Sequence, residues 1–397
     1  MNVRKAGLFF CVLMAGCLNL FAAVTIPFEE AICEVPPTRT DNIPKEHIEK
    51  EEDAYLEGYI QALVNAHYYE FDVLVYVENG DVYLYNLPKN DLIKSSIIRF
   101  VSDLPEVKSV TEVEKFPDAK LAKLEKREVQ PQIKGIWFPQ TTVLYPPMIA
   151  NPRATLYSAV YRIGDNVMGN KTIAVSLGDN FPIYRWRNVF KWKGDLQIDI
   201  QAGIWSVFKM GIDYHGEISE LINTDYLVGF PLSYAFDKWA FRLRAYHVSC
   251  HLGDEYLVHN PGVKRVNPSM EAIDFFVAYQ VLESLRFYIG PGWVFHSDDT
   301  YPIDPFYIEY GGEFRFLGYK SYYNKLYGTC FIAAFIRNWQ VNHWQFDGTY
   351  MIGYEWSKLQ GVGRKMRLFI NYHHGYSEGQ FFKDSTSYTG FGLSWGF

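Results

Sequence analysis

The chain has 397 residues and a formal net charge of −7, with 48% hydrophobic, 17% aromatic and 21% charged residues. The length allows two domains, and the negative charge argues against non-specific binding to nucleic acid, so we expect no nucleic-acid partner. After the first two dozen residues, the sequence has no apolar run of about 18 residues, which excludes a further transmembrane helix. The aromatic excess therefore needs another explanation.

The N-terminus has the anatomy of a secretory signal peptide over residues 1–23. Arg4 and Lys5 precede an apolar run that ends in small residues near Ala23, and this arrangement predicts export. Alternatively, within this signal peptide, Leu13-Met-Ala-Gly-Cys17 is a lipoprotein cleavage site, and Cys17 is the lipidated residue. Residues 24–44 contain four prolines and lack periodicity, so we interpret them as a linker.

Residues 45–114 predict a small α+β domain with the order α-β-β-α-β. Apolar residues at helical spacing predict a helix over 45–65, and a second helix follows the hairpin. The hairpin is indicated by Asn79-Gly80, a favoured two-residue turn between two alternating segments. The expected elements after the first helix are strands at 72–77 and 81–85, a helix at 91–102 and a strand at 107–113.

This element order, with the closing run Leu104-Pro-Glu-Val-Lys-Ser-Val110, resembles the small periplasmic domain called BON, for bacterial osmotic and nodulation proteins. The resemblance covers about residues 50–113. It implies association with phospholipid or with a periplasmic envelope partner, and no catalytic residues. Asn86 and Glu106 depart from the pattern, since the family usually has glycine at both positions. The alternative is an unrelated small α+β domain.

Residues 115–153 predict a spacer, charged at first and then rich in proline and aromatic residues. From residue 154 to 397 the chain consists of short aromatic strands separated by turn residues. An even set of about twelve antiparallel strands is typical of an all-β transmembrane barrel in a bacterial outer membrane. The expected strands are 155–164, 172–187, 195–210, 225–236, 239–252, 271–283, 285–296, 305–318, 326–337, 344–357, 364–375 and 386–397.

The C-terminal strand supports this interpretation. It places Phe391, Leu393, Trp395 and Phe397 on one face, and it resembles the terminal strand by which the barrel assembly machinery recognises outer-membrane proteins. Loop lengths also alternate, with a tight turn at Asp237-Lys238 and longer loops at the opposite ends. We therefore expect contact with outer-membrane lipid and an N-terminal domain in the periplasm. A soluble β-sandwich is the alternative.

The strand 239–252 carries the most unusual pattern. Its alternation puts arginines on the lumenal face and aromatic or aliphatic residues on the lipid face, but His247 and Ser249 also fall on the lipid face. The run from His247 through Glu255 is similar to a family of uncharacterised bacterial outer-membrane proteins known only as a domain of unknown function. That resemblance implies a location and no established activity.

Serine becomes a nucleophile when a base takes its proton and a third group orients the base. His247 and Ser249 are two apart on one strand face, and Glu271 shares that face on the next strand, so the three form a candidate catalytic set. The His-x-Ser arrangement resembles outer-membrane phospholipase A and the lipid A deacylases. Those families have Asn shortly after the serine, where this chain has Cys250 and His251. The alternative is that both residues are ordinary interfacial side chains.

Two weaker hypotheses concern ions. We expect no resident cofactor, but Asp254 and Glu255 are candidate calcium ligands. Lumenal arginines predict either ion pairs with lumenal carboxylates or a narrow anion channel. Three functions remain open: an envelope protein that binds lipid or a partner through its small domain, a lipid acyl hydrolase, and a channel.

Overall fold

The computed structural model describes residues 45–117, 134–211, 219–264, 266–321, 326–358, 362–379 and 381–397. The predicted signal peptide, the linker through residue 44, the Cys17 alternative and part of the predicted spacer lie outside the described residues. Residues Glu49–Phe397 form one compact unit. Within the described ranges, no helix is long and apolar enough to cross a membrane.

The small domain has the predicted order of elements. Strand β1 pairs antiparallel with β2, and β2 pairs parallel with β3, so β2 is central. Apolar side chains from both helices and from the sheet, including Ile60, Leu84 and Ile97, are fully buried between them. The elements are α2 (Lys45–His67), β1 (Leu74–Glu78), β2 (Asp81–Tyr85), α3 (Asp91–Ser102) and β3 (Ser109–Val113).

At both residues that depart from the BON pattern, Asn86 and Glu106, the backbone has a conformation that favours glycine. Asn86 has φ +64° and Glu106 has φ +70°, which is the left-handed region that side chains with a Cβ rarely adopt. Asn tolerates this region better than Glu does. The chain therefore keeps a glycine-like conformation at both positions without glycine.

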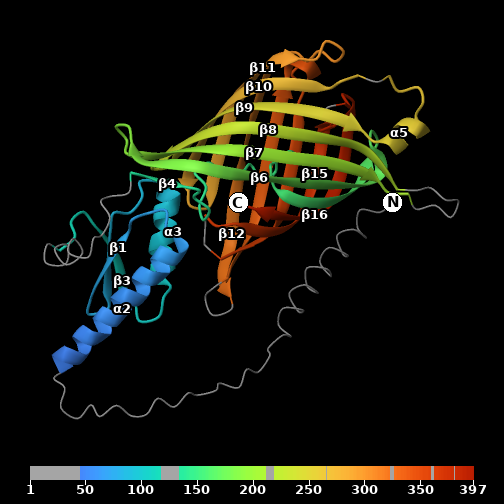
Figure 1. Cartoon of the computed structure of the whole chain (residues 1–397). Helices are drawn as coiled ribbons and strands as arrows, with labels where there is room; N and C mark the ends of the chain where they lie inside the picture. Colours follow the sequence, from blue (N-terminus) through green and yellow to red (C-terminus); the bar gives the residue numbers. More distant parts are fainter. Residues whose placement is uncertain are drawn as a thin grey trace, which may run out of the picture. The chain divides into compact units, whose positions relative to one another are not determined.

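Twelve antiparallel strands, β5 to β16, close into a barrel, as predicted (Figure 1). Each strand pairs with its sequence neighbours, and β16 returns to pair with β5. A short strand, β4 (Gly135–Trp137), adds to the end of β6. The barrel strands are β5 (Tyr157–Asp165), β6 (Gly169–Val189), β7 (Gly194–Lys209), β8 (Glu220–Phe236), β9 (Trp239–Leu252), β10 (Ser269–Leu282), β11 (Leu285–Ser297), β12 (Phe306–Ser321), β13 (Leu326–Trp339), β14 (Asp347–Ser357), β15 (Lys365–Tyr376) and β16 (Ser385–Gly396).

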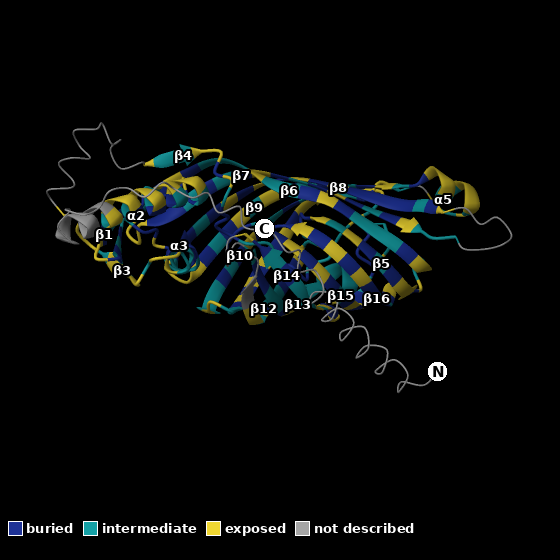
Figure 2. Cartoon of the chain, turned by 90° about the horizontal axis from the view of Figure 1, so that it is seen from below, coloured by how far each residue is buried: buried dark blue, intermediate teal, exposed yellow. Residues whose placement is uncertain are grey.

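The barrel wall alternates between buried and exposed residues, which Figure 2 shows as bands along the strands. On β9, Arg242 and Tyr246 point into the lumen and are buried, whereas Leu243 on the outer face is 42% exposed. Large aromatic and aliphatic side chains cover the exterior in the same way on the other strands. An exposed apolar exterior around a polar lumen is the construction of an outer-membrane barrel.

The C-terminal strand follows the prediction except at its end. Phe391, Leu393 and Trp395 are exposed on the outer face, but Phe397 is only 8% exposed. Strand β16 ends at Gly396, and the guanidinium of Arg364 lies 4.5 Å from the centre of the Phe397 ring. The alternation therefore stops one residue before the terminus.

The end of the predicted spacer is placed differently from our expectation, because residues 141–153 lie inside the barrel. Arg286 on β11 donates hydrogen bonds to the carbonyl oxygens of Pro146 (2.9 Å) and Pro147 (2.6 Å). The backbone N–H of Ile149 donates to Glu313 on β12 at 3.1 Å. A segment with neither helical nor strand period gives no sequence signal for such a position. We call residues 141–153 the lumenal segment.

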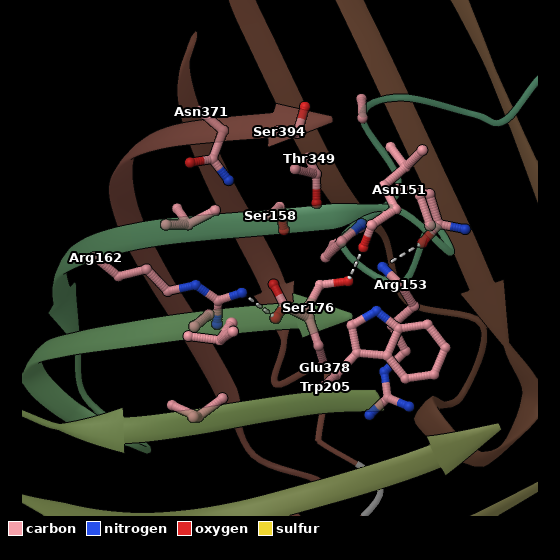
Figure 3. A pocket seen from close by; sticks show the side chains of 18 of the residues that line it. Asn151, Arg153, Ser158, Arg162, Ser176, Trp205, Thr349, Asn371, Glu378 and Ser394 are labelled. Carbon is pink, nitrogen blue, oxygen red and sulfur yellow. Dashed lines mark hydrogen bonds and ion pairs between the residues drawn. The ribbon is translucent and has the colours of Figure 1, made fainter. Parts of the chain in front are cut away.

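A loop from the opposite end also enters the lumen. Glu378, between β15 and β16, forms an ion pair of 2.7 Å with Arg162, and both side chains are buried. Figure 3 shows this pair beside Trp205 and Arg153, the latter paired with Asp225. The cavity between these groups measures about 60 Å³, which is room for a few water molecules.

Strand alternation predicts which arginines face the lumen, and most of these arginines form ion pairs with carboxylates there. Asp274 is paired with Arg242 and with Arg244. Arg185 differs, because its partner is Glu70 of the small domain at 2.9 Å, and both side chains are completely buried. A buried pair between the small domain and the wall ties these two parts together at that point.

Candidate functional site

The candidate site is built on three neighbouring strands, β9, β10 and β11. Strand register places His247 opposite Glu271, and Glu271 opposite His296. All three side chains are on the outer face, with exposed fractions of 44%, 33% and 68%. The register therefore produces a polar row on the outside of an otherwise apolar wall.

The row is joined by hydrogen bonds through Glu271. Its Oε1 lies 2.7 Å from Nδ1 of His247, and its Oε2 lies 2.5 Å from Nδ1 of His296. One carboxylate therefore fixes the orientation of two imidazole rings, which leaves the Nε2 atom of each ring directed away from it. A base oriented in this way suits proton transfer.

Ser249 lies one position further along the same face of β9. Its partner across the strands is Ser269 on β10. Among the described residues, no hydrogen bond joins Ser249 to His247. Side chains two apart on one face of a strand are about 6–7 Å apart at their roots, so rotation about χ1 of either residue changes whether they meet. The structure thus brings His247 and Glu271 together and leaves Ser249 beside them.

The row lies at the boundary of the apolar band. The adjacent row on one side consists of Ala245, Ile273 and Trp293. On the other side, the partners are Ser249 and Ser269. Polar residues on a lipid-facing wall destabilise the barrel least near the membrane–water interface. This position therefore tolerates the polar row and keeps it within reach of lipid.

His296 was not among the residues predicted from sequence. Simple alternation along β11 puts it in the lumenal phase, opposite to Phe295. A β-bulge between β10 and β11 shifts the register at Glu271, so Phe295 and His296 are both exposed. A bulge has no clear sequence signal here, and this explains the omission.

Neighbouring residues have other roles. Cys250 points into the lumen and is buried, so it does not replace the Asn of the families with a His-x-Ser strand. His251 is exposed on the outer face and its ring packs edge-on against Tyr226 at 5.8 Å.

In the described part of the chain, Asp254 and Glu255 do not belong to a calcium coordination shell. Asp254 and Glu255 are exposed in the first turn of α5 (Asp254–His259). No group of three or more His, Cys, Asp or Glu side chains in the described ranges has the arrangement of a metal site.

Several solved structures share the barrel fold. Outer membrane phospholipase A from Escherichia coli is 14% identical, with 60% of this chain and 91% of that chain covered and a TM-score of 0.41. The calcium-bound dimer of the Salmonella typhi outer membrane phospholipase is also 14% identical, with 62% and 93% covered and a TM-score of 0.40. LpxR from Salmonella typhimurium is 10% identical, with 61% and 100% covered and a TM-score of 0.30.

No curated protein matches the chain. The family described as "Protein of unknown function (DUF1207)" matches residues 70–397. Because this match covers most of the sequence, the chain belongs to that family.

Proposed function

We propose that the protein is an outer-membrane acyl hydrolase that cleaves an ester of a membrane lipid at the outer wall of its barrel. Ser249 is the nucleophile, His247 the general base and Glu271 the group that orients His247. The observation that carries this proposal is the 2.7 Å contact between Glu271 and Nδ1 of His247. Because Nδ1 is engaged, Nε2 is the atom left to accept a proton from serine.

The reaction proceeds in two steps. Ser249 Oγ attacks the ester carbonyl while its proton passes to Nε2 of His247, and a bond forms between Oγ and the acyl carbon. The bond to the leaving alcohol breaks, and the proton of His247 goes to that alcohol. Water then attacks the acyl-enzyme with His247 again as base, which releases the fatty acid and restores the serine.

The position of the polar row supports a lipid substrate. In a phospholipid or in lipid A, the esters lie just beneath the headgroups, between the polar surface and the hydrocarbon. The row borders the apolar band at Ala245 and Ile273, so its height on the wall corresponds to the ester level of an adjacent lipid.

Ester hydrolysis by the purified, detergent-refolded chain tests this proposal, with phospholipid and lipid A as substrates. Ser249→Ala and His247→Ala are expected to lower kcat at least about a thousandfold. Ser269→Ala and His251→Ala are matched controls, because they remove the same groups from neighbouring positions on the same face. Equal activity in all five proteins would exclude the proposed chemistry.

A second proposed function belongs to the small domain, which we place in the periplasm. The α-β-β-α-β order and the left-handed conformations of Asn86 and Glu106 support the BON-like assignment. The domain then binds phospholipid or an envelope partner. Nanodiscs of neutral lipid that contain the full chain should capture anionic vesicles, and Lys89→Glu with Lys108→Glu, both at exposed positions, should reduce the capture. Capture unaffected by these changes would argue against lipid binding by this domain.

A further inference from the structure

The outer face of the barrel carries a tyrosine beside Ser249 that the proposed reaction does not use. Tyr226 on β8 is the direct cross-strand partner of Ser249 on β9, and its side chain is 41% exposed on the outer face. On the other side of Ser249, the partner is Ser269 of β10. Ser249 therefore lies between a tyrosine and a second serine in one row across three strands.

Acyl transfer at Ser249 requires a hydrogen-bond donor for the carbonyl oxygen of the ester. When Oγ attacks, this oxygen takes up the negative charge of the tetrahedral intermediate, and a donor placed beside it stabilises that charge. In α/β-hydrolases, one such donor is the backbone N–H of the residue after the nucleophile. Here the N–H of Cys250 donates to the carbonyl oxygen of Pro268 at 3.0 Å, so it is not free to bind an oxyanion.

Of the side chains next to Ser249, Tyr226 has the length that an oxyanion donor needs. Directly opposite residues of an antiparallel pair have Cβ atoms about 4.5–5.5 Å apart, which is within reach of an aromatic side chain. The hydroxyl of Ser269 stays close to its own Cβ, so it reaches the Ser249 side chain rather than an acyl group attached to it. His251 lies in the next row, where its partner on β8 is Thr224. The Tyr226 hydroxyl, in contrast, can extend over Ser249 itself.

The ring of Tyr226 lies on the side of Ser249 that is away from the proposed base. Its centre is 5.8 Å from the ring centre of His251, which follows Ser249 by two positions, whereas His247 precedes Ser249 by two positions. This edge-on contact does not engage the tyrosine hydroxyl, and within the described ranges no hydrogen bond does. The O–H is therefore available as a donor on the side opposite to the base.

We propose that the hydroxyl of Tyr226 is the oxyanion donor of this site, an inference that rests on the proposed ester hydrolysis. Tyr226 donates a hydrogen bond to the carbonyl oxygen as the bond between Ser249 Oγ and the acyl carbon forms, and again when water attacks the acyl-enzyme. No proton leaves the tyrosine in either step. His247 carries the proton, and Tyr226 stabilises the negative charge.

Steady-state hydrolysis of dihexanoyl phosphatidylcholine by the purified, detergent-refolded full chain tests this inference. Tyr226→Phe removes only the hydroxyl. Tyr350→Phe is the matched control, because it removes the same group from a tyrosine of β14 whose side chain is 40% exposed. Tyr226→Phe should lower kcat by about a hundredfold to a thousandfold with little change in KM, whereas Tyr350→Phe should equal the original protein. Heat-dependent electrophoretic mobility confirms that each variant is folded.

Inhibition by an alkyl boronic acid gives a second readout that a purely structural role of Tyr226 would not change. The boron forms an anionic tetrahedral adduct with Ser249 Oγ, which resembles the intermediate of the reaction. Tyr226→Phe should weaken this inhibition at least about tenfold, and it should leave inhibition by a non-hydrolysable ether phospholipid unchanged.

The outcomes separate this inference from the proposed function. Absence of hydrolysis by the original protein, or equal hydrolysis by Ser249→Ala, would overturn the proposed function and this inference with it. If hydrolysis depends on Ser249 but folded Tyr226→Phe keeps its kcat, or changes only in KM, the inference about Tyr226 alone is wrong.

Discussion

Glu271 and His247 are direct partners across β10 and β9, and Glu271 Oε1 lies 2.7 Å from Nδ1 of His247. A carboxylate in this position fixes the tautomer of the imidazole and stabilises its protonated form. The pair therefore supplies the base and the orienting carboxylate of the proposed catalytic set on an otherwise apolar wall.

Replacing Glu271 by Gln should lower the rate of ester hydrolysis by about 10²- to 10⁴-fold, because an amide does not stabilise the imidazolium that forms in the reaction. Steady-state kinetics with a short-chain phospholipid in micelles measures this effect. Glu255→Gln, at an exposed position in α5, is the control. An unchanged kcat in Glu271→Gln would show that the carboxylate has no part in the chemistry.

Replacing His296 by Gln should have a smaller effect than replacing His247. His296 contacts Glu271 rather than the proposed nucleophile, so it acts by positioning the carboxylate. Losses from such supporting residues are about ten- to a hundredfold, and we expect the loss in kcat with little change in KM. A loss as large as that of His247→Ala would instead assign His296 a direct role.

The lumenal segment should prevent ion conduction through the barrel. In planar bilayers, the unmodified protein is expected to show little conductance. Replacement of Thr142–Ala150 by a Gly-Ser sequence of equal length should open a path, because the contacts of Pro146, Pro147 and Ile149 with the wall are lost. The same replacement of Asp254–His259 is the control. High conductance of the unmodified protein would contradict an occluded lumen.

Glu106→Gly should stabilise the small domain by about 1 kcal/mol, because glycine adopts a φ of +70° without steric cost. Urea unfolding followed by circular dichroism at 222 nm reports on this domain, since α2 and α3 hold 23 and 12 residues and α5 only 6. Thr111→Gly, in strand β3, should destabilise it. Destabilisation by Glu106→Gly would mean that the Glu106 side chain stabilises the folded domain by more free energy than its left-handed backbone conformation costs.

The stability of the small domain should also depend on pH through Asp72. Burial raises the pKa of the Asp72 carboxyl above its ordinary value, and the positive charge of Arg187 offsets part of this effect. The folded state therefore binds this proton more tightly than the unfolded chain does, so stability falls as pH rises from about 4 through the raised pKa. Asp72→Asn should remove that decrease in urea midpoints measured between pH 4 and 7. If the urea midpoint of Asp72→Asn fell by the same amount between pH 4 and 7, the pH dependence would belong to another group.

Strand alternation made most of the barrel predictable. The strand from Trp239 to Leu252 has its predicted ends, and its lipid-facing register holds because a two-residue period is unambiguous where one face is apolar. The same period correctly placed Glu271 beside His247. Both results depend on local pattern and on pairing between strands that are adjacent in sequence.

Contacts between distant parts of the chain were not predictable in this way. Arg286 binds the carbonyl of Pro146, 140 residues away in sequence, and proline-rich segments have no period that indicates a burial site. His296 depends on a bulge that shifts the phase of its strand. The partner of Arg185 is Glu70 rather than the expected lumenal carboxylate, because the small domain contributes to the lumenal network.

The lumenal segment also restricts the sequence of events during biogenesis. A peptide whose carbonyls are bonded to inward-facing arginines is surrounded by wall on every side once β16 meets β5. Inserting it into a finished cylinder would require its polar backbone to pass a lumen already filled with paired charges. We therefore expect the segment to be in place before β16 pairs with β5.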